Sequence, residues 1–213
     1  QRGGRHDHLI PGRGRPAEGG TVYGVGRGWG GNDDDLGAVT LGPDGARGAM
    51  REGAVFIDHA TVSADIARRL ADEAEKRGFH AVDAPVSGGV GGATAGTLTF
   101  MVGGPDAVFA KAKPVLDKMG KNIVHAGDSG SGQAAKICNN MILGISMIAV
   151  SEGFMLGKRL GLDAQKLFNV VSTASGSCWS LVNYCPVPGP VPASPANRDY
   201  QAGFTAAMML KDL

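Results

Sequence analysis

Residues 54–86 read "AVFIDHATVSADIARRLADEAEKRGFHAVDAPV", in which two short apolar runs flank an amphipathic segment. The first run, "AVFID", is typical of a buried parallel strand. In the segment between the runs, Ile66, Leu70 and Ala74 fall on one helical face, and Ser63 offers a hydroxyl for the helix start. A strand, a helix and a second strand in this order predict an α/β fold with a parallel sheet.

The same alternation continues toward the C-terminus. Residues 96–104 and 121–127 read as a third and a fourth strand. A helix is expected to begin at Pro105, and Pro114 is expected to kink or divide it. Residues 54–128 are therefore predicted to form an α/β domain with a parallel sheet, in which ligands bind at the carboxyl ends of the strands.

One of those strand ends carries Ser87, Gly88 and Gly89. A serine hydroxyl and glycine N–H groups, with no side chains to block approach, suit a small anion such as a carboxylate. The alternative is a flexible glycine-rich turn, and these residues alone do not decide between the two.

The stretch "GSGQAAKICNN", residues 130–140, is expected to open a helix that runs to about Gly161. Lys136 and Asn140 are four residues apart and share a face of that helix. A lysine in such a position is often a surface residue. The following apolar residues, 141–156, indicate a helix buried almost all round, so the Lys–Asn pair needs a polar partner in a cleft.

Residues 1–53 differ from the rest, since they hold 16 of the 35 glycines and no lysine. Residues 26–31 match the GxGxxG pattern, but neither a strand nor a helix is indicated around them. Asp33–Asp35 and His6–His8 are interpreted as solvated loops, so no metal site is predicted. The segment is left unassigned, as disordered or aberrant. Its abrupt end resembles translation in a shifted reading frame, which re-reading the DNA would test.

Composition excludes several classes of partner. The chain has 21 Lys and Arg against 20 Asp and Glu, so no net charge recruits nucleic acid. The apolar run 142–150 is too short to span a bilayer, and no membrane association is predicted. The three cysteines form no CxxC pair, which favours reduced thiols in a bacterial cytoplasm.

Four motifs occur in an order that resembles the β-hydroxyacid dehydrogenase family: residues 83–104, 130–140, 178–189 and the closing "KDL". The resemblance covers about residues 54–213. It implies that residues 54–128 are the C-terminal part of a Rossmann-type NAD(P)-binding domain. It also implies an incomplete all-helical dehydrogenase domain at residues 129–213, through which the chain forms a homo-oligomer.

The resemblance also implies a role for ten residues. Lys136 is the catalytic residue. The substrate-binding residues are Ser87, Gly88, Gly89, Asn140, Trp179 and Tyr184. The cofactor-binding residues are Thr61, Lys211 and Asp212, with NAD as the cofactor and NADP not excluded.

The implied reaction is oxidation of a β-hydroxy acid to its semialdehyde. "CWSLVNYCPVPG", residues 178–189, resembles the branch that acts on 3-hydroxyisobutyrate in valine catabolism. Two alternatives stay open. One is a sister activity, such as tartronate semialdehyde reductase or a dehydrogenase acting on serine. The other is a truncated, inactive chain that only associates with helical partners.

Overall fold

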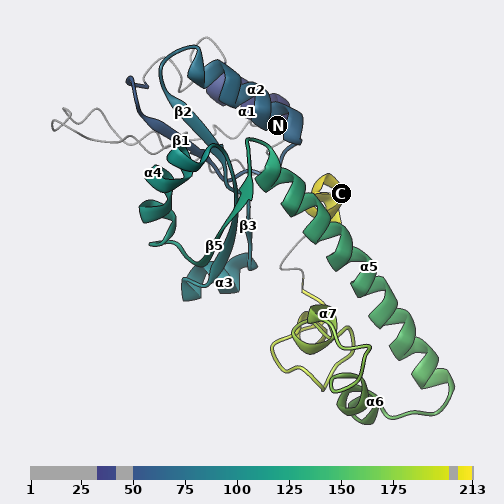
Figure 1. Ribbon diagram of the computed structural model, residues 1–213. Coiled ribbons are helices and arrows are strands. Elements are labelled where there is room, and N and C mark those ends of the chain that lie inside the picture. The colour runs from purple at the N-terminus through teal and green to yellow at the C-terminus, as the bar shows by residue number, and fades with distance from the viewer. Residues whose placement is uncertain (1–32, 42–49, 202–205, 213) are drawn as a thin grey trace, which may run out of the picture.

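The computed structural model describes residues 33–41, 50–201 and 206–212. A sheet domain and a small helical unit are connected by one long helix, α5 (Ser131–Arg159), as Figure 1 shows. The sheet domain contains α1 (Asp33–Leu41), β1 (Val55–Asp58), α2 (Ala64–Glu75), β2 (His80–Asp83), β3 (Val86–Ser87), α3 (Gly89–Ala95), β4 (Leu98–Gly103), α4 (Asp106–Leu116) and β5 (Gly120–Gly127). The helical unit contains α6 (Ala164–Val171), α7 (Trp179–Val182) and the 3₁₀ helix η2 (Pro195–Asn197). The last described helix, α8 (Ala206–Asp212), lies beside the beginning of α5.

The sheet confirms the predicted α/β class, but it is mixed rather than wholly parallel. Its order is β1-β2-β4-β3, and β5 also pairs with β4. The pairs β1–β2 and β4–β5 are parallel, whereas β4 runs antiparallel to both β2 and β3. A helix connects the strands of each parallel pair. Between β2 and β4 the chain instead turns back through β3 and the short α3, and an antiparallel pair needs no crossover helix.

Helices cover both faces of the sheet. On one face, Phe56 and Phe79 pack with Leu70 of α2 and Leu36 of α1. On the other face, the apolar side chains of β1, β2 and β4 pack against Val108, Ala112 and Leu116 of α4. Burial on both faces explains why β1 reads as a continuous apolar run rather than an alternating one.

One local prediction was wrong in part, and another was wrong. Helix α4 is not divided at Pro114, because the proline lies near its end, where one lost backbone hydrogen bond does not stop the helix. Asp33–Asp35 are not a solvated loop but begin α1. Tertiary contacts support this helix: the Asp33 carboxylate accepts hydrogen bonds from the Ser63 N–H and hydroxyl. The predictions for residues 6–8 and 26–31 lie outside the described residues.

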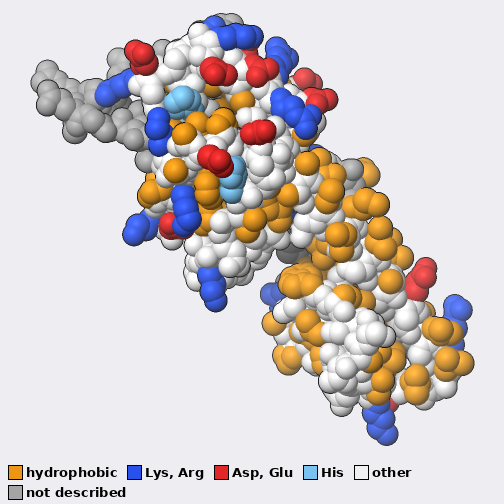
Figure 2. All heavy atoms as spheres, in the orientation of Figure 1, with side chains coloured by type: hydrophobic (Ala, Val, Ile, Leu, Met, Phe, Trp, Pro, Cys, Tyr) orange, Lys and Arg blue, Asp and Glu red, His pale blue; other side chains and the backbone are white. Residues whose placement is uncertain are grey.

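Helix α5 has the predicted bounds, but its predicted burial was wrong. Most of its apolar side chains beyond the third turn are exposed, including Ile142, which is 69% exposed, and Ile148, which is 62% exposed. Figure 2 shows hydrophobic side chains gathered along this part of the molecule. By length and composition, α5 is the one helix of the described residues that could cross a membrane. Core helices of soluble proteins have the same length and composition, so this alone does not place α5 in a bilayer.

Candidate active site

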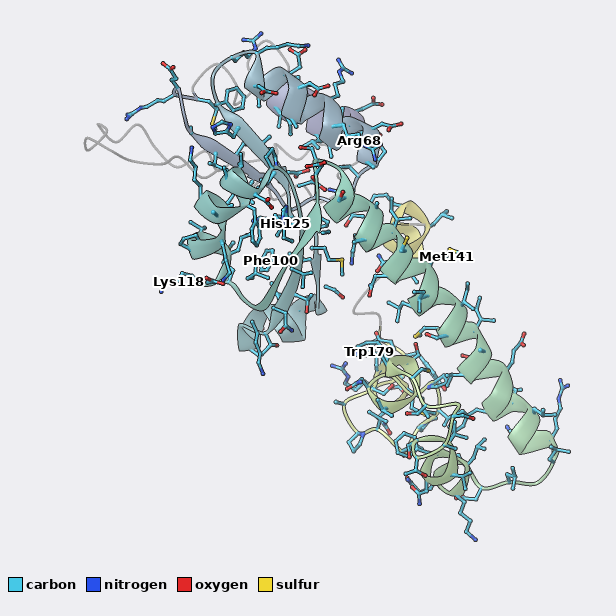
Figure 3. The ribbon with its side chains drawn as sticks, in the orientation of Figure 1. Arg68, Phe100, Lys118, His125, Met141 and Trp179 are labelled. Atoms are coloured by element: carbon cyan, nitrogen blue, oxygen red, sulfur yellow. The ribbon has the colours of Figure 1, made fainter. Side chains whose placement is uncertain are left out.

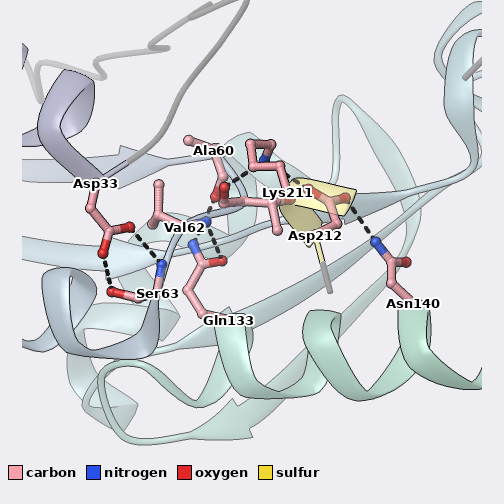
Figure 4. A network of polar contacts seen from close by, with 9 residues as sticks. Asp33, Ala60, Val62, Ser63, Gln133, Asn140, Lys211 and Asp212 are labelled. Atoms are coloured by element: carbon pink, nitrogen blue, oxygen red, sulfur yellow. Dashed lines mark hydrogen bonds and ion pairs between the residues drawn. The ribbon is translucent and has the colours of Figure 1, made fainter. Parts of the chain in front are cut away.

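Four of the predicted site residues are joined where the start of α5, residues 59–63 and α8 come together (Figure 4). The Nζ of Lys211 donates to the carbonyl oxygen of Thr61 at 2.7 Å and lies 2.7 Å from one Asp212 oxygen. The other Asp212 oxygen accepts from the Asn140 side-chain amide at 2.8 Å. Residues separated by 150 positions in sequence, Thr61 and Lys211, are thus joined directly.

Lys136 lies one turn before Asn140 and is only 8% exposed. Burial lowers the pKa of its ammonium group below the ordinary 10.5, because the charged form loses solvation. Asp212 raises this pKa and Lys211 lowers it, and both effects are smaller than that of burial. The amine is therefore disposed to exchange a proton nearer to neutral pH than a surface lysine.

The end of β2 fixes the start of α5. The Asp83 carboxylate accepts from the backbone N–H groups of Gly130, at 2.7 Å, and Gln133, at 2.9 Å. A negative charge at a helix N-terminus is favourable, because the N–H groups there have no partner within the helix. Gly132 packs so closely that a Cβ there would collide with the carbonyl oxygens of Met101 and Asp83. Neither Asp83 nor Gln133 was predicted as a site residue, although Asp83 begins the motif at residues 83–104 and Gln133 lies within the motif at residues 130–140.

A pocket of about 470 Å³ opens beside this cluster. Its lining residues are Asp33, Asp34, Thr61, Val62, Ser63, Ile137, Lys211 and Asp212. The pocket thus combines three carboxylates, one lysine, hydroxyl groups and apolar side chains, so it offers both donors and acceptors to one polar end of a cofactor. All three predicted cofactor-binding residues line it.

Another buried carboxyl group belongs to Asp58, the last residue of β1. Asp58 is 2% exposed, and one of its oxygens has no hydrogen-bond partner. Burial raises its pKa from 3.8 to about 7; the Ala60 N–H opposes this shift and the nearby Asp83 adds to it. The neighbouring His59 ring contacts the Ala84 carbonyl oxygen at 2.9 Å, and burial lowers its pKa. Asp58 is therefore neutral in acidic solution and costly to ionise.

Ser87, Gly88 and Gly89 form the end of β3 and the start of α3. Both glycines have positive φ, +131° and +58°, which favours glycine over other residues. Among the described residues, no hydrogen bond or ion pair connects these three to Lys136. The two positive φ values explain why glycines stand here, and the contacts of the described residues leave these three outside the Lys136 cluster.

Trp179 and Tyr184 lie on the helical unit, as Figure 3 shows for Trp179. Their rings stack with centroids 5.7 Å apart. The hydroxyl of Ser180, next to Trp179, bonds that of Ser146 on α5 at 2.7 Å, so α7 is attached to the middle of α5. Within the described residues neither aromatic ring is bonded to Lys136, and the pair is a separate group.

Family models match most of the chain. The model described as the NAD binding domain of 6-phosphogluconate dehydrogenase matches residues 31–127. The model described as NAD-binding of NADP-dependent 3-hydroxyisobutyrate dehydrogenase matches residues 130–213. The first match begins at residue 31 rather than 54, where the sequence analysis placed the start of the resemblance, so it includes α1. The two matches meet at the beginning of α5.

Similar proteins carry related names. A probable 3-hydroxyisobutyrate dehydrogenase of Mycobacterium tuberculosis is 52% identical over 78% of this chain and 56% of its own length. The 3-hydroxyisobutyrate dehydrogenase of Pseudomonas aeruginosa is 50% identical over 83% of this chain and 59% of its own length. The chain thus spans little more than half the length of these relatives. A solved structure of the M. tuberculosis 3-hydroxyisobutyrate dehydrogenase with L-serine superposes with a TM-score of 0.79 at 48% identity. That match covers 85% of this chain and 61% of the other.

Proposed function

Because the chain belongs to the β-hydroxyacid dehydrogenase family, we propose that its protein oxidises 3-hydroxyisobutyrate to methylmalonate semialdehyde with a nicotinamide cofactor. This is a step of valine catabolism. The observation that carries the proposal is the buried Lys136 in one cluster with Asn140, Lys211 and Asp212. The names of the relatives support the choice of substrate.

In this proposal Lys136 handles the proton of the substrate hydroxyl. A bound nicotinamide cofactor, NAD or NADP, supplies the hydride acceptor. The neutral amine of Lys136 takes the hydroxyl proton at Nζ, and its lowered pKa supports that role. In the reverse direction the ammonium group returns the proton and stabilises negative charge on the oxygen. Asp212 holds the Asn140 amide in a fixed orientation beside it.

The remaining predicted residues complete the proposed site. Thr61 and Lys211 line the pocket that would receive the nicotinamide end of the cofactor. Ser87, Gly88 and Gly89 would hold the substrate carboxylate with backbone N–H groups and one hydroxyl. Trp179 and Tyr184 would form an aromatic wall of the substrate pocket.

A second candidate substrate is serine, because the related M. tuberculosis structure is described with L-serine. Serine and 3-hydroxyisobutyrate share a carboxylate and a β-hydroxyl group, so Ser87 and Lys136 would act on either one in the same way. They differ at the carbon between these groups, which carries an ammonium in serine and a methyl group in 3-hydroxyisobutyrate.

The exposed face of α5 supports a homo-oligomer that forms through the helical domain. Residues 141–156 would extend about 24 Å as a helix, shorter than the roughly 30 Å hydrocarbon core of a bilayer. The turns before them are bound to the sheet domain through Asp83 and to α8 through Asp212. We therefore propose a second copy of the chain, rather than a membrane, as the partner, and a cytoplasmic location.

A substrate panel tests the proposed function. Activity is measured on a full-length version, in which this chain is joined to segments that complete the length of its relatives. With NAD and NADP in turn, kcat/KM for 3-hydroxyisobutyrate should exceed that for serine, and tartronate semialdehyde should be reduced poorly. A higher kcat/KM for serine would favour the second candidate. Absence of cofactor binding by this chain alone, measured by calorimetry, would favour the inactive chain.

A further inference from the structure

The side chain of Gln133 joins two segments that are distant in sequence. Its amide is completely buried. The Oε1 accepts from the backbone N–H of Val62 at 3.1 Å, and the Nε2 donates to the carbonyl oxygen of Ala60 at 2.7 Å. These two backbone groups lie on either side of Thr61. Figure 4 shows the amide bridging them from the first turns of α5.

The start of α5 does not need this side chain to stay in place. Asp83 holds the Gly130 and Gln133 N–H groups, and Gly132 packs directly on the backbone of β2 and β4. The helix is therefore a fixed support, and the amide of Gln133 acts on residues 59–63, which we call the Thr61 loop.

The Thr61 loop in turn contacts the groups around Lys136. The Thr61 carbonyl oxygen accepts from Lys211, which lies next to Asp212, and Asp212 accepts from Asn140. These contacts therefore link two positions on α5: Gln133, which binds the Thr61 loop, and Asn140, which donates to Asp212 from two turns later. Lys136 lies between these two points on the helix.

We propose that Gln133 is a positioning residue that clamps the Thr61 loop to the catalytic helix and so sets Thr61 and Lys211 for cofactor binding. The expected effect on cofactor binding rests on the proposed function. The clamp itself rests only on the hydrogen bonds of Gln133. Glutamine suits this task because one amide both donates and accepts: without it the buried Val62 N–H and the part-buried Ala60 carbonyl oxygen would each lose a partner.

Two variants of the full-length version separate the two hydrogen bonds. Gln133→Leu removes both. Gln133→Glu keeps an acceptor for Val62, but its ionised carboxylate cannot donate to the Ala60 carbonyl oxygen. Protonation restores that donor, and burial near the Asp83 carboxylate raises the pKa of the new glutamate. Gln165→Leu, on the exposed surface of α6, serves as the matched control.

Amide hydrogen exchange tests the clamp without any activity. At neutral pH both Gln133 variants should speed exchange in residues 59–63 by at least about tenfold, the effect of losing one buried hydrogen bond. Exchange in residues 130–140 should stay as in the unaltered protein. As pH falls, the Gln133→Glu value should return toward that of the unaltered protein at the same pH, whereas the Gln133→Leu value should not.

Cofactor binding tests the functional consequence. By fluorescence titration, Kd for NADH should rise about tenfold in Gln133→Leu, while KM for the hydroxy acid should change little. Unchanged exchange at residues 59–63, or an equal increase throughout the chain, would overturn the clamp even if the enzyme is active. Faster loop exchange with unchanged NADH affinity would overturn the positioning role. If the unaltered protein binds no NADH, the exchange result still decides the clamp, and the proposed function is what fails.

Discussion

Helix α5 has two parts that differ in what surrounds them. In residues 131–140, Gln133, Lys136 and Asn140 are buried and have partners within the described chain. In residues 141–156, Ile142, Ile145 and several other apolar side chains are more than half exposed. Polar groups are thus buried at one end of the helix and apolar groups are exposed along the rest.

The two parts of α5 therefore differ in where their interaction partners lie. Burying a lysine is unfavourable unless its environment is built for it, so the first part indicates chemistry within the chain. The row of exposed apolar side chains in the second part is the observation behind the proposed contact with a second copy of the chain. The following variants test the two parts, beginning with the largest expected effect.

Lys136→Ala tests the catalytic role of the buried part of α5. In the full-length version we expect kcat to fall by about two orders of magnitude or more, the scale of general acid–base catalysis. The control is Lys118→Ala, since Lys118 is exposed and follows α4. Near-normal kcat for Lys136→Ala across the pH range would remove the catalytic assignment.

Asp58→Asn tests how much the buried carboxyl group of Asp58 lowers the stability of the fold when it is ionised. The pKa of Asp58 is about 7 in the folded protein, above its ordinary value of 3.8. The stability gained by keeping this carboxyl group protonated is therefore fully present below about pH 4. It is lost as pH rises through 7. Asparagine is neutral throughout, so the variant should be more stable than the unaltered protein by about 2 kcal/mol at pH 8, roughly half of the full shift, and by little at pH 4. Urea unfolding at both pH values measures this, and an equal difference at the two would count against it.

Ile145→Glu tests the exposed part. A charge placed in an interface between copies should weaken association by at least about tenfold, because it must be desolvated there. Sedimentation should then report a smaller assembly than for the unaltered protein. Val124→Glu, on β5 and similarly exposed, is the control and should leave the assembly intact. If both variants keep the assembly, this face of α5 is not the interface.

Gly88→Ala tests whether the turn after β3 binds the carboxylate of the substrate on which Lys136 acts. We expect kcat/KM for the hydroxy acid to fall by about tenfold or more, because alanine disfavours the positive φ and obstructs the carboxylate. Gly91→Ala is the control, since a Cβ there meets nothing within 4 Å. An alcohol without a carboxylate should be a poor substrate and should lose less. Equal losses for both substrates would make Gly88 a residue of the fold only.

The sequence predicted the features that local patterns encode. Apolar periodicity located β1, α2 and the bounds of α5, and the resemblance brought together Thr61, Lys136 and Lys211. It did not predict α1, because that helix depends on Ser63 and on packing against α2. Nor did it predict that Ile142 is exposed. An apolar helix has the same sequence pattern whether it is covered by residues of its own chain or by those of another chain. Gln133 was missed for a similar reason: its partners, Ala60 and Val62, are distant in sequence.

The pH dependence of kcat most directly tests the claim that Lys136 carries the proton within its cluster. The unaltered protein should show a limb, rising with pH in the oxidation direction, with a pKa below 10.5. Lys211→Met removes a neighbouring cation and should move this pKa up, whereas Asp212→Asn removes an anion and should move it down. Opposite shifts of this kind are what the cluster predicts. If both variants leave the limb unmoved, or shift it in the same direction, Lys136 is not the group that titrates.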